Sequence, residues 1–171
     1  MKVMITSAGA GPAISIIKYL KREGIDVVST DISENAAGLH LSKGYIVPKI
    51  DDGNFSTKII EISEKESVDL IIPILDIELP IFLKIKDISK IPVAINSEKC
   101  INDSLNKRKS IKVCESNNIL FPKEINPKKY NGKLIGRPIY GTGSRGVIVS
   151  DTVMRNIPEN YIWQEYIEGQ E

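Results

Sequence analysis

The sequence predicts an α/β protein in which a doubly wound parallel sheet is followed by a smaller α+β unit with antiparallel strands. As far as residue 97, short apolar runs alternate with amphipathic segments, which is the pattern of a parallel sheet covered by helices. After residue 121, short strand patterns bracket tight turns instead, which is typical of antiparallel pairing. We therefore expect two domains, formed by residues 1–97 and 98–171.

The first domain is expected to begin with a buried strand and a glycine turn. Pro12 suits the first turn of the helix that follows, because its missing N–H has no partner there in any case, and Gly24 ends that helix. The remaining apolar and amphipathic runs then alternate. They predict strands at Lys2–Thr6, Asp26–Thr30, Tyr45–Pro48, Leu70–Ile74 and Val93–Asn96, and further helices at Phe55–Glu66 and Ile77–Ile88.

The second domain is expected to open with two helical pieces and to continue as a small sheet. The sequence stops where a further strand pattern is due, so we expect the chain to be part of a longer protein. The predicted elements are helices at Ser97–Ile101 and Leu105–Asn117, and strands at Lys133–Arg137, Val147–Ser150 and Tyr161–Tyr166.

Composition narrows the classes of partner. The 171 residues include 23 basic and 22 acidic side chains, which gives no electrostatic reason to expect nucleic acid. No apolar run has the length of a membrane span, and the N-terminus does not resemble a signal peptide, so we expect no membrane partner and a cytoplasmic location. Two separate cysteines and one histidine do not suggest a metal site.

A glycine turn, Gly9-Ala10-Gly11, follows the first strand. With Asp31 at the end of the second strand, it partly matches the dinucleotide-binding fingerprint. That fingerprint needs a small residue where Ile14 stands, and Pro12 removes one N–H from the helix start. We therefore favour a tight strand-to-helix turn whose residues line a substrate cleft at the edge of the sheet.

Two acids, Asp76 and Glu78, follow the apolar strand Leu70–Ile74 at the same edge. Ligands of open α/β sheets bind at this edge, so the carboxylates could hold an amine or a hydroxyl group of a substrate. Acids also stabilise the beginning of a helix. Both interpretations stay open.

A second glycine loop lies between two predicted strands, in the stretch GRPIYGTGSRGV. Glycine backbone can approach phosphates closely, hydroxyl groups can add donors, and the planar guanidinium of Arg137 suits phosphate oxygens. A plain hairpin, the alternative, usually needs only one or two glycines. The loop residues are Gly141, Thr142, Gly143, Ser144, Arg145 and Gly146.

The order of these motifs resembles the ATP-grasp superfamily, in its carbamoyl-phosphate-synthase-like branch, over nearly the whole chain. The segments TSAGAGPAISIIKYLKREG and LIIPILDIEL resemble the Rossmann-like domain that precedes the ATP-grasp domain. NKRKSIKVCESNNILFPK resembles the entry helix, which places Lys107 on a phosphate-contacting position, and GRPIYGTGSRGV places Arg137 on the second cationic position. WQEYIEGQE resembles the adenine-binding segment. It implies Glu165, Tyr166 and Ile167 beside the base and Glu171 beside the ribose hydroxyls.

The resemblance implies the N-terminal part of an ATP-dependent carbon–nitrogen ligase. Such an enzyme binds MgATP, forms an acyl phosphate from a small-molecule carboxylate, and transfers the acyl group to an amine-type nucleophile. The family's magnesium ligands would lie beyond residue 171, so we expect this chain alone to be inactive. A homodimer is compatible with the family. The alternatives are an NAD-linked oxidoreductase built on Gly9–Gly11 and Asp31, or a non-catalytic nucleotide-binding module.

Overall fold

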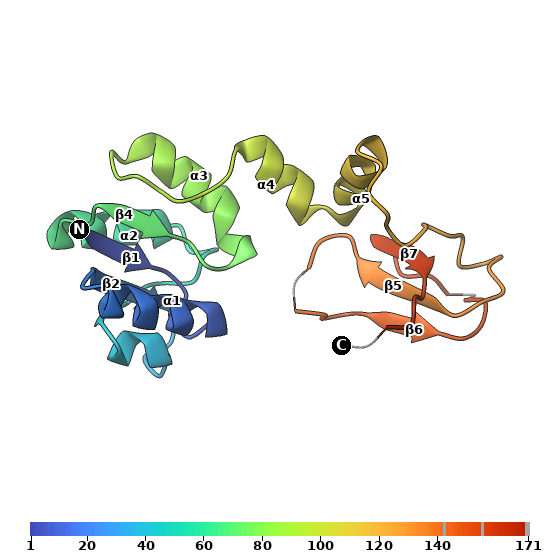
Figure 1. The fold of residues 1–171 in the computed structure, drawn as a ribbon, viewed down its shortest axis with the longest axis horizontal. Helices are drawn as coiled ribbons and strands as arrows, with labels where there is room; N and C mark the ends of the chain where they lie inside the picture. The colour runs from blue at the N-terminus through green and yellow to red at the C-terminus, as the bar shows by residue number, and fades with distance from the viewer. Residues whose placement is uncertain (142, 155, 170–171) are drawn as a thin grey trace. The chain divides into compact units, whose positions relative to one another are not determined.

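The computed structural model describes residues 1–141, 143–154 and 156–169, and the chain divides into two compact units, Met1–Glu98 and Lys99–Glu171 (Figure 1). Each unit has its own sheet. No helix in the described part of the chain is long and apolar enough to cross a membrane.

The first unit contains a four-stranded sheet with the order β3-β2-β1-β4, in which every neighbouring pair is parallel. The predicted doubly wound α/β fold is therefore confirmed for this unit. Strand β1 is central, because Val3 pairs with Val27 on one side and with Leu70 on the other. The strands are β1 (Lys2–Ile5), β2 (Asp26–Asp31), β3 (Lys43–Ile46) and β4 (Leu70–Ile72).

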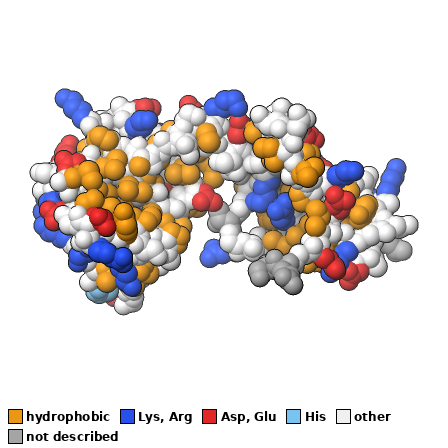
Figure 2. All heavy atoms as spheres, viewed as in Figure 1, with side chains coloured by type: hydrophobic (Ala, Val, Ile, Leu, Met, Phe, Trp, Pro, Cys, Tyr) orange, Lys and Arg blue, Asp and Glu red, His pale blue; other side chains and the backbone are white. Residues whose placement is uncertain are grey.

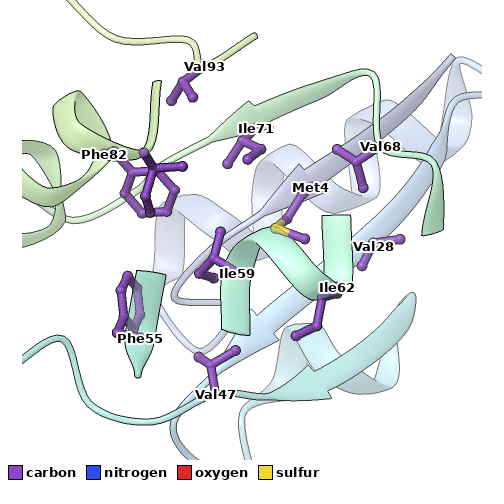
Figure 3. Close-up of a cluster of buried hydrophobic side chains, with 11 residues drawn as sticks. Met4, Val28, Val47, Phe55, Ile59, Ile62, Val68, Ile71, Phe82 and Val93 are labelled. Atoms are coloured by element: carbon purple, nitrogen blue, oxygen red, sulfur yellow. The ribbon is translucent and has the colours of Figure 1, made fainter. Parts of the chain in front are cut away.

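Apolar side chains cover both faces of this sheet, because successive residues of a strand point to opposite sides. On one face, Met4 packs with helices α2 (Phe55–Glu66) and α3 (Leu79–Ile88), as Figure 3 shows. On the other face, Val3 and Ile5 pack with Ala13 and Ile17 of helix α1 (Gly11–Arg22). Burial on both faces explains why β1 and β4 consist mainly of apolar residues.

The predicted strand Val93–Asn96 is wrong: the segment makes only an isolated parallel bridge between Val93 and Ile71. The amide of Ala94 donates to the carbonyl of Ile71 at 2.8 Å, but the amide of Ile95 turns back to the carbonyl of Val93 at 3.0 Å. The backbone therefore leaves the sheet after one residue. Strand β3 also begins two residues before its predicted start, and two short 3-10 helices, η1 (Ala37–His40) and η2 (Asp76–Glu78), complete the unit.

The second unit begins with two short helices and ends in a three-stranded antiparallel sheet of order β6-β5-β7, as predicted. The shortest strand, β6, pairs only with β5. The elements are α4 (Glu98–Leu105), α5 (Lys107–Ser116), β5 (Leu134–Pro138), β6 (Ile148–Ser150) and β7 (Tyr161–Glu165).

Close packing of the two longer strands depends on a glycine. Gly136 pairs directly with Trp163, whose side chain is buried and stacks on Tyr161 with ring centroids 6.0 Å apart. A Cβ atom added to Gly136 would lie 2.5 Å from the indole ring. The indole can therefore lie flat over β5 only because this position has no side chain.

Candidate functional site

Lys107 is the first residue of helix α5, and its position is fixed by the cap before it. The side-chain oxygen of Asn106 accepts hydrogen bonds from the amides of Arg108 at 3.0 Å and Lys109 at 3.2 Å, which is the usual role of an N-cap residue. The ammonium group of Lys107 donates to the carbonyl of Gly141 at 2.9 Å. The helix start therefore brings a positive charge to the beginning of the second glycine loop.

The basic residue that follows Lys107 points elsewhere. The guanidinium of Arg108 donates to the carbonyl of Tyr161 at 3.2 Å and lies 3.5 Å from a carboxylate oxygen of Glu124. Lys107, and not Arg108, is therefore the residue that the fold brings to the glycine loop. Lys107 thus contacts the loop, whereas Arg108 contacts strand β7.

Backbone conformation explains the glycines of this loop. Gly143 and Gly146 have φ values of +63° and +74°, in the left-handed region that favours glycine. A Cβ atom on Gly146 would also lie 3.0 Å from the hydroxyl of Tyr161 and 3.1 Å from Pro138. The Tyr161 hydroxyl donates to the Gly146 carbonyl at 2.7 Å, which fastens the end of the loop to strand β7.

A cavity of about 210 Å³ lies under this loop. Among the described residues, its lining includes the cations Lys107, Arg137 and Arg145 and no acidic side chain. This charge suits an anion with several oxygens. The lining residues are Lys107, Arg137, Pro138, Gly141, Gly143, Ser144, Arg145 and Val147.

Arg137, on strand β5, is half-buried and lines this cavity and a second one. Its guanidinium donates to the side-chain oxygen of Gln164. Gln164 is buried, with 1% of its surface exposed. Its Nε atom is buried and has no hydrogen-bond partner among the described residues. An unpaired buried donor is unfavourable, so this part of the guanidinium is available to a ligand.

The second cavity has a volume of about 320 Å³ and follows the end of strand β7. The amide of Glu165 donates to the carbonyl of Lys123 at 3.1 Å, and the amide of Tyr166 donates to the carbonyl of Lys133 at 3.0 Å. Both amides are therefore engaged within the protein. The lining residues are Pro122, Ile135, Arg137, Gln164, Glu165, Tyr166, Ile167 and Gly169.

Ile167 is the third residue of the segment that the sequence assigned to adenine. Its side chain is 62% exposed, and no hydrogen bond of its amide is found within the described part of the chain. Among the three residues expected beside the base, Ile167 therefore supplies the amide that can face a ligand. Thr142 and Glu171, which were also expected at this site, lie outside the described residues.

Sequence reasoning missed two residues that shape the site, Gln164 and Tyr161. Strand alternation contains the signal for Gln164: it pairs with Ile135 and lies two residues from Ile162, which pairs with Arg137, so its side chain shares the face of Arg137. Tyr161 gave no such signal, because its hydroxyl meets the loop only through the fold.

In the first unit, the turn at Gly9 is held by an acid. The amide of Gly9 donates to one carboxylate oxygen of Asp31 at 2.8 Å, and the amide of Ser33 donates to the other at 2.9 Å. Ala10 lines a cavity at this edge of the sheet, whereas Gly9 and Gly11 are not among its lining residues. Asp31 therefore stabilises the turn.

The two acids after β4 have different surroundings. Glu78 is buried, and its carboxylate accepts hydrogen bonds from the hydroxyls of Thr6 at 2.7 Å and Ser7 at 3.0 Å and from the amide of Leu75 at 3.1 Å. Asp76 is exposed and does not line the cavity. Glu78 is thus hydrogen-bonded within the protein, and of the two acids it is the one that lines the cavity, so their role toward a substrate stays a prediction.

Within the described ranges, no group of three or more His, Cys, Asp or Glu side chains is arranged to hold a metal ion. The described residues therefore do not form a magnesium site by themselves.

Comparison with known proteins gives a family match for the first unit and similar solved folds for nearly the whole chain. Residues 3–94 match the family model described as PylC-like, N-terminal domain. A sequence search of curated proteins gives no significant match.

Solved structures of similar fold cover nearly the whole chain. N5-carboxyaminoimidazole ribonucleotide synthetase from Thermotoga maritima aligns with a TM-score of 0.71 and 15% identity, over 98% of this chain and 46% of that one. L-amino acid ligase from Bacillus licheniformis aligns with a TM-score of 0.71 and 15% identity, over 98% of this chain and 44% of the ligase. N5-carboxyaminoimidazole synthetase from Staphylococcus aureus, complexed with ADP, aligns with a TM-score of 0.67 and 14% identity, over 97% of this chain and 47% of the synthetase. The chain spans about half the length of these proteins.

Proposed function

Since the chain belongs to the PylC-like family through the domain of residues 3–94, we propose that it is the N-terminal portion of an ATP-dependent ligase that joins a carboxylate to an amine. The fold agrees with the predicted Rossmann-like domain followed by the first part of an ATP-grasp domain. The three solved structures named above are two synthetases and a ligase, and one of these three is complexed with ADP. The carbamoyl-phosphate-synthase-like branch stays a prediction.

The observation that carries the proposal is the position of Arg137 between two adjoining cavities of the second unit. One is small and lined by cations, and the other is larger and lined by Ile135, Tyr166 and Ile167 among others. A nucleotide has the same division into an anionic end and a flat base. Arg137 would then contact the part of the molecule where the two ends join.

The phosphate end would lie under the glycine loop. Lys107, Arg137 and Arg145 supply positive charge, and the loop backbone from Gly143 to Gly146 allows close approach. The buried, unpaired Nε of Arg137 fits this ligand, because a phosphate oxygen would satisfy it. Figure 2 shows blue Lys and Arg side chains grouped on one face of this unit.

The base would lie in the second cavity, beside residues 164–169. The amide of Ile167 is the donor we assign to the adenine edge, because the amides of Glu165 and Tyr166 are already bonded within the protein. The apolar side chains of Ile135 and Ile167 offer surfaces to the flat ring.

ATP would supply the phosphoryl group that activates the carboxylate as an acyl phosphate. The chain's own part is to hold the phosphates and to neutralise their charge, which is the main contribution of proteins to phosphoryl transfer. Lys107 does so from a helix N-terminus, where the helix dipole also favours an anion. An amine displaces phosphate from such an intermediate, which gives the carbon–nitrogen bond.

The competing NAD interpretation is disfavoured by the geometry of the first glycine turn. The Gly9 amide, which would face a pyrophosphate, is bonded to Asp31, and the Asp31 carboxylate, which would face a ribose, accepts two amides of the protein. A dinucleotide would have to displace both bonds. The second unit, in contrast, has a cationic cavity with an unpaired donor.

Titration calorimetry of the 171-residue chain with ADP and with NAD tests the proposal. We expect binding of ADP only, and we expect Lys107→Ala to weaken it by roughly tenfold or more, the scale of a hydrogen bond to a charged group. Lys112→Ala, on the exposed side of the same helix, is the matched control and should not change the affinity. Binding of NAD in preference to ADP, or equal effects of the two substitutions, would refute the assignment.

A further inference from the structure

A further cavity lies in the first unit, at the edge of the sheet where its parallel strands end. Its volume is about 520 Å³, which is within the range of small-molecule sites. Residues just after β1, β2, β3 and β4 all contribute to its wall. The lining residues are Ser7, Ala10, Asp31, Ile32, Val47, Lys49, Ile50, Asp51, Phe55, Leu75, Ile77 and Glu78.

Most of this wall is apolar. Phe55 and Val47 belong to the buried core and lie toward one end of that cluster (Figure 3), so this part of the cavity wall is formed by packed core side chains. Three further apolar side chains are exposed at the cavity although they are large: Ile32 at 58%, Leu75 at 41% and Ile77 at 61%. Apolar surface gathered in a concave site favours a ligand with an apolar part.

The polar residues of the wall decide which ligand fits. Two of the three carboxylates already accept hydrogen bonds within the protein. Asp31 accepts from the amides of Gly9 and Ser33, and Glu78 accepts from the Thr6 hydroxyl and the Leu75 amide. The side chains of Asp51 and Lys49 are exposed and make no hydrogen bond or ion pair with the other described residues. The wall thus offers one available carboxylate and one available ammonium group.

The charge of the wall excludes some ligands. Three carboxylates and one ammonium group leave it negative, so a phosphorylated or dicarboxylate ligand would be repelled. A ligand with an ammonium group would be attracted, and a zwitterion could also use the single lysine.

We propose that this cavity binds the amine substrate of the reaction, a small amphipathic amine such as an amino acid with an aliphatic side chain. The aliphatic part lies against Phe55, Val47 and Ile77, the ammonium group faces Asp51, and the carboxylate faces Lys49. The assignment of this ligand as the nucleophile rests on the proposed ligase function. The binding itself depends only on residues of the first unit.

The test is a two-dimensional ¹H–¹⁵N NMR titration of the 171-residue chain with four small molecules: L-leucine, 3-methylbutylamine, 4-methylpentanoate and ribose 5-phosphate. We expect L-leucine and 3-methylbutylamine to shift the amide signals around Ala10, Ile50 and Ile77. The other two, which lack the ammonium group, should give no saturable shifts. Absence of binding by both amines, or stronger binding of ribose 5-phosphate, would overturn the proposal.

Two pairs of variants localise the site. Asp51→Asn should weaken the binding of L-leucine about fivefold, the scale of one exposed charge pair, whereas Asp87→Asn, an exposed acid outside the cavity, should not. Ile77→Asp should abolish the shifts, whereas Ile88→Asp should leave them, because Ile88 is similarly exposed at 67% and lies outside the cavity. All four positions are exposed, so the variants should fold. Equal effects within either pair would contradict the site.

The same titration separates this inference from the nucleotide assignment. ADP should shift signals of the second unit, such as those of Gly143 and Ile167, in an independent experiment. If L-leucine binds and ADP does not, the cavity stands and the proposed nucleotide function fails. If ADP binds and the amines do not, the nucleotide function is supported and the proposal for this cavity fails.

Discussion

Arg137 donates a hydrogen bond from its guanidinium to the side-chain oxygen of the buried Gln164, across the pairing of strands β5 and β7. The side-chain amide of Gln164 donates in turn to the carbonyl of Pro122. This chain of bonds holds the guanidinium between the two cavities of the second unit. An arginine at a cleft is expected to matter little for folding, but here it is the partner of a buried amide.

Arg137→Ala should therefore lower both the affinity for ADP and the free energy of unfolding. The loss of stability should be about 1–3 kcal/mol, because the buried oxygen of Gln164 loses its donor. Urea unfolding followed by the fluorescence of Trp163, the only tryptophan, measures it. Arg145→Ala is the matched control: its side chain is exposed in the same cavity, so only the affinity should fall. Equal stability of the two variants would contradict the structural role of Arg137.

Gly146→Ala should destabilise the glycine loop. The residue has a φ of +74°, and an added Cβ would lie 3.0 Å from the Tyr161 hydroxyl, so we expect a cost of about 1–2 kcal/mol. Gly53→Ala, in a turn of the first unit where a Cβ has no atom within 4 Å, should change stability much less. Urea unfolding of both variants gives the comparison, and a neutral Gly146→Ala would mean that the loop adopts another conformation.

Acid should weaken the first unit through Glu66. The side chain is only 4% exposed, and its pKa is lowered from 4.5 to about 2, first by the hydrogen bond from Lys43 at 2.7 Å and then by that from the hydroxyl of Tyr45. Because the folded pKa lies below the unfolded value, the stabilisation is present above about pH 4.5 and is lost as the pH falls toward 2.

Unfolding by urea between pH 2 and 6 checks this prediction with Glu66→Gln. The variant should be less stable than the natural chain at pH 6, and the difference should shrink as the pH falls toward 2. Glu64→Gln, an exposed position on the same helix, should show no such trend. A difference that stays constant with pH would show that Glu66 keeps an ordinary pKa when folded.

Glu78→Gln should destabilise the first unit, whereas Asp76→Asn should be nearly neutral. Four donors point at the Glu78 carboxylate: the hydroxyls of Thr6 and Ser7 and the amides of Ile74 and Leu75. An amide group would present its NH₂ to one or more of them, which we expect to cost about 1–3 kcal/mol. Thermal unfolding followed by circular dichroism distinguishes the two variants. Equal melting temperatures would favour the substrate-binding interpretation of Glu78.

Local pattern was sufficient for most of the fold. Helix Phe55–Glu66 has the bounds that its apolar spacing predicts, because a helix that covers a sheet must repeat its apolar residues every three or four positions. The parallel and antiparallel sheets also follow from the lengths of the connections between strands. The strand expected at Val93 fails because its backbone turns back after one bridge, which no side-chain pattern reveals.

The sequence by itself determined the two kinds of sheet and the presence of cations beside a glycine loop. Only the tertiary structure decided which cations meet the loop, since Lys107 and Arg108 are neighbours in sequence but donate to Gly141 and to Tyr161 respectively. It also decided that Gln164 is hydrogen-bonded to Arg137 and that the Glu78 carboxylate accepts hydrogen bonds from Thr6 and Ser7. Side-chain chemistry is set by residue type, but the partner of each polar group depends on contacts between segments far apart in the chain, and these exist only after folding.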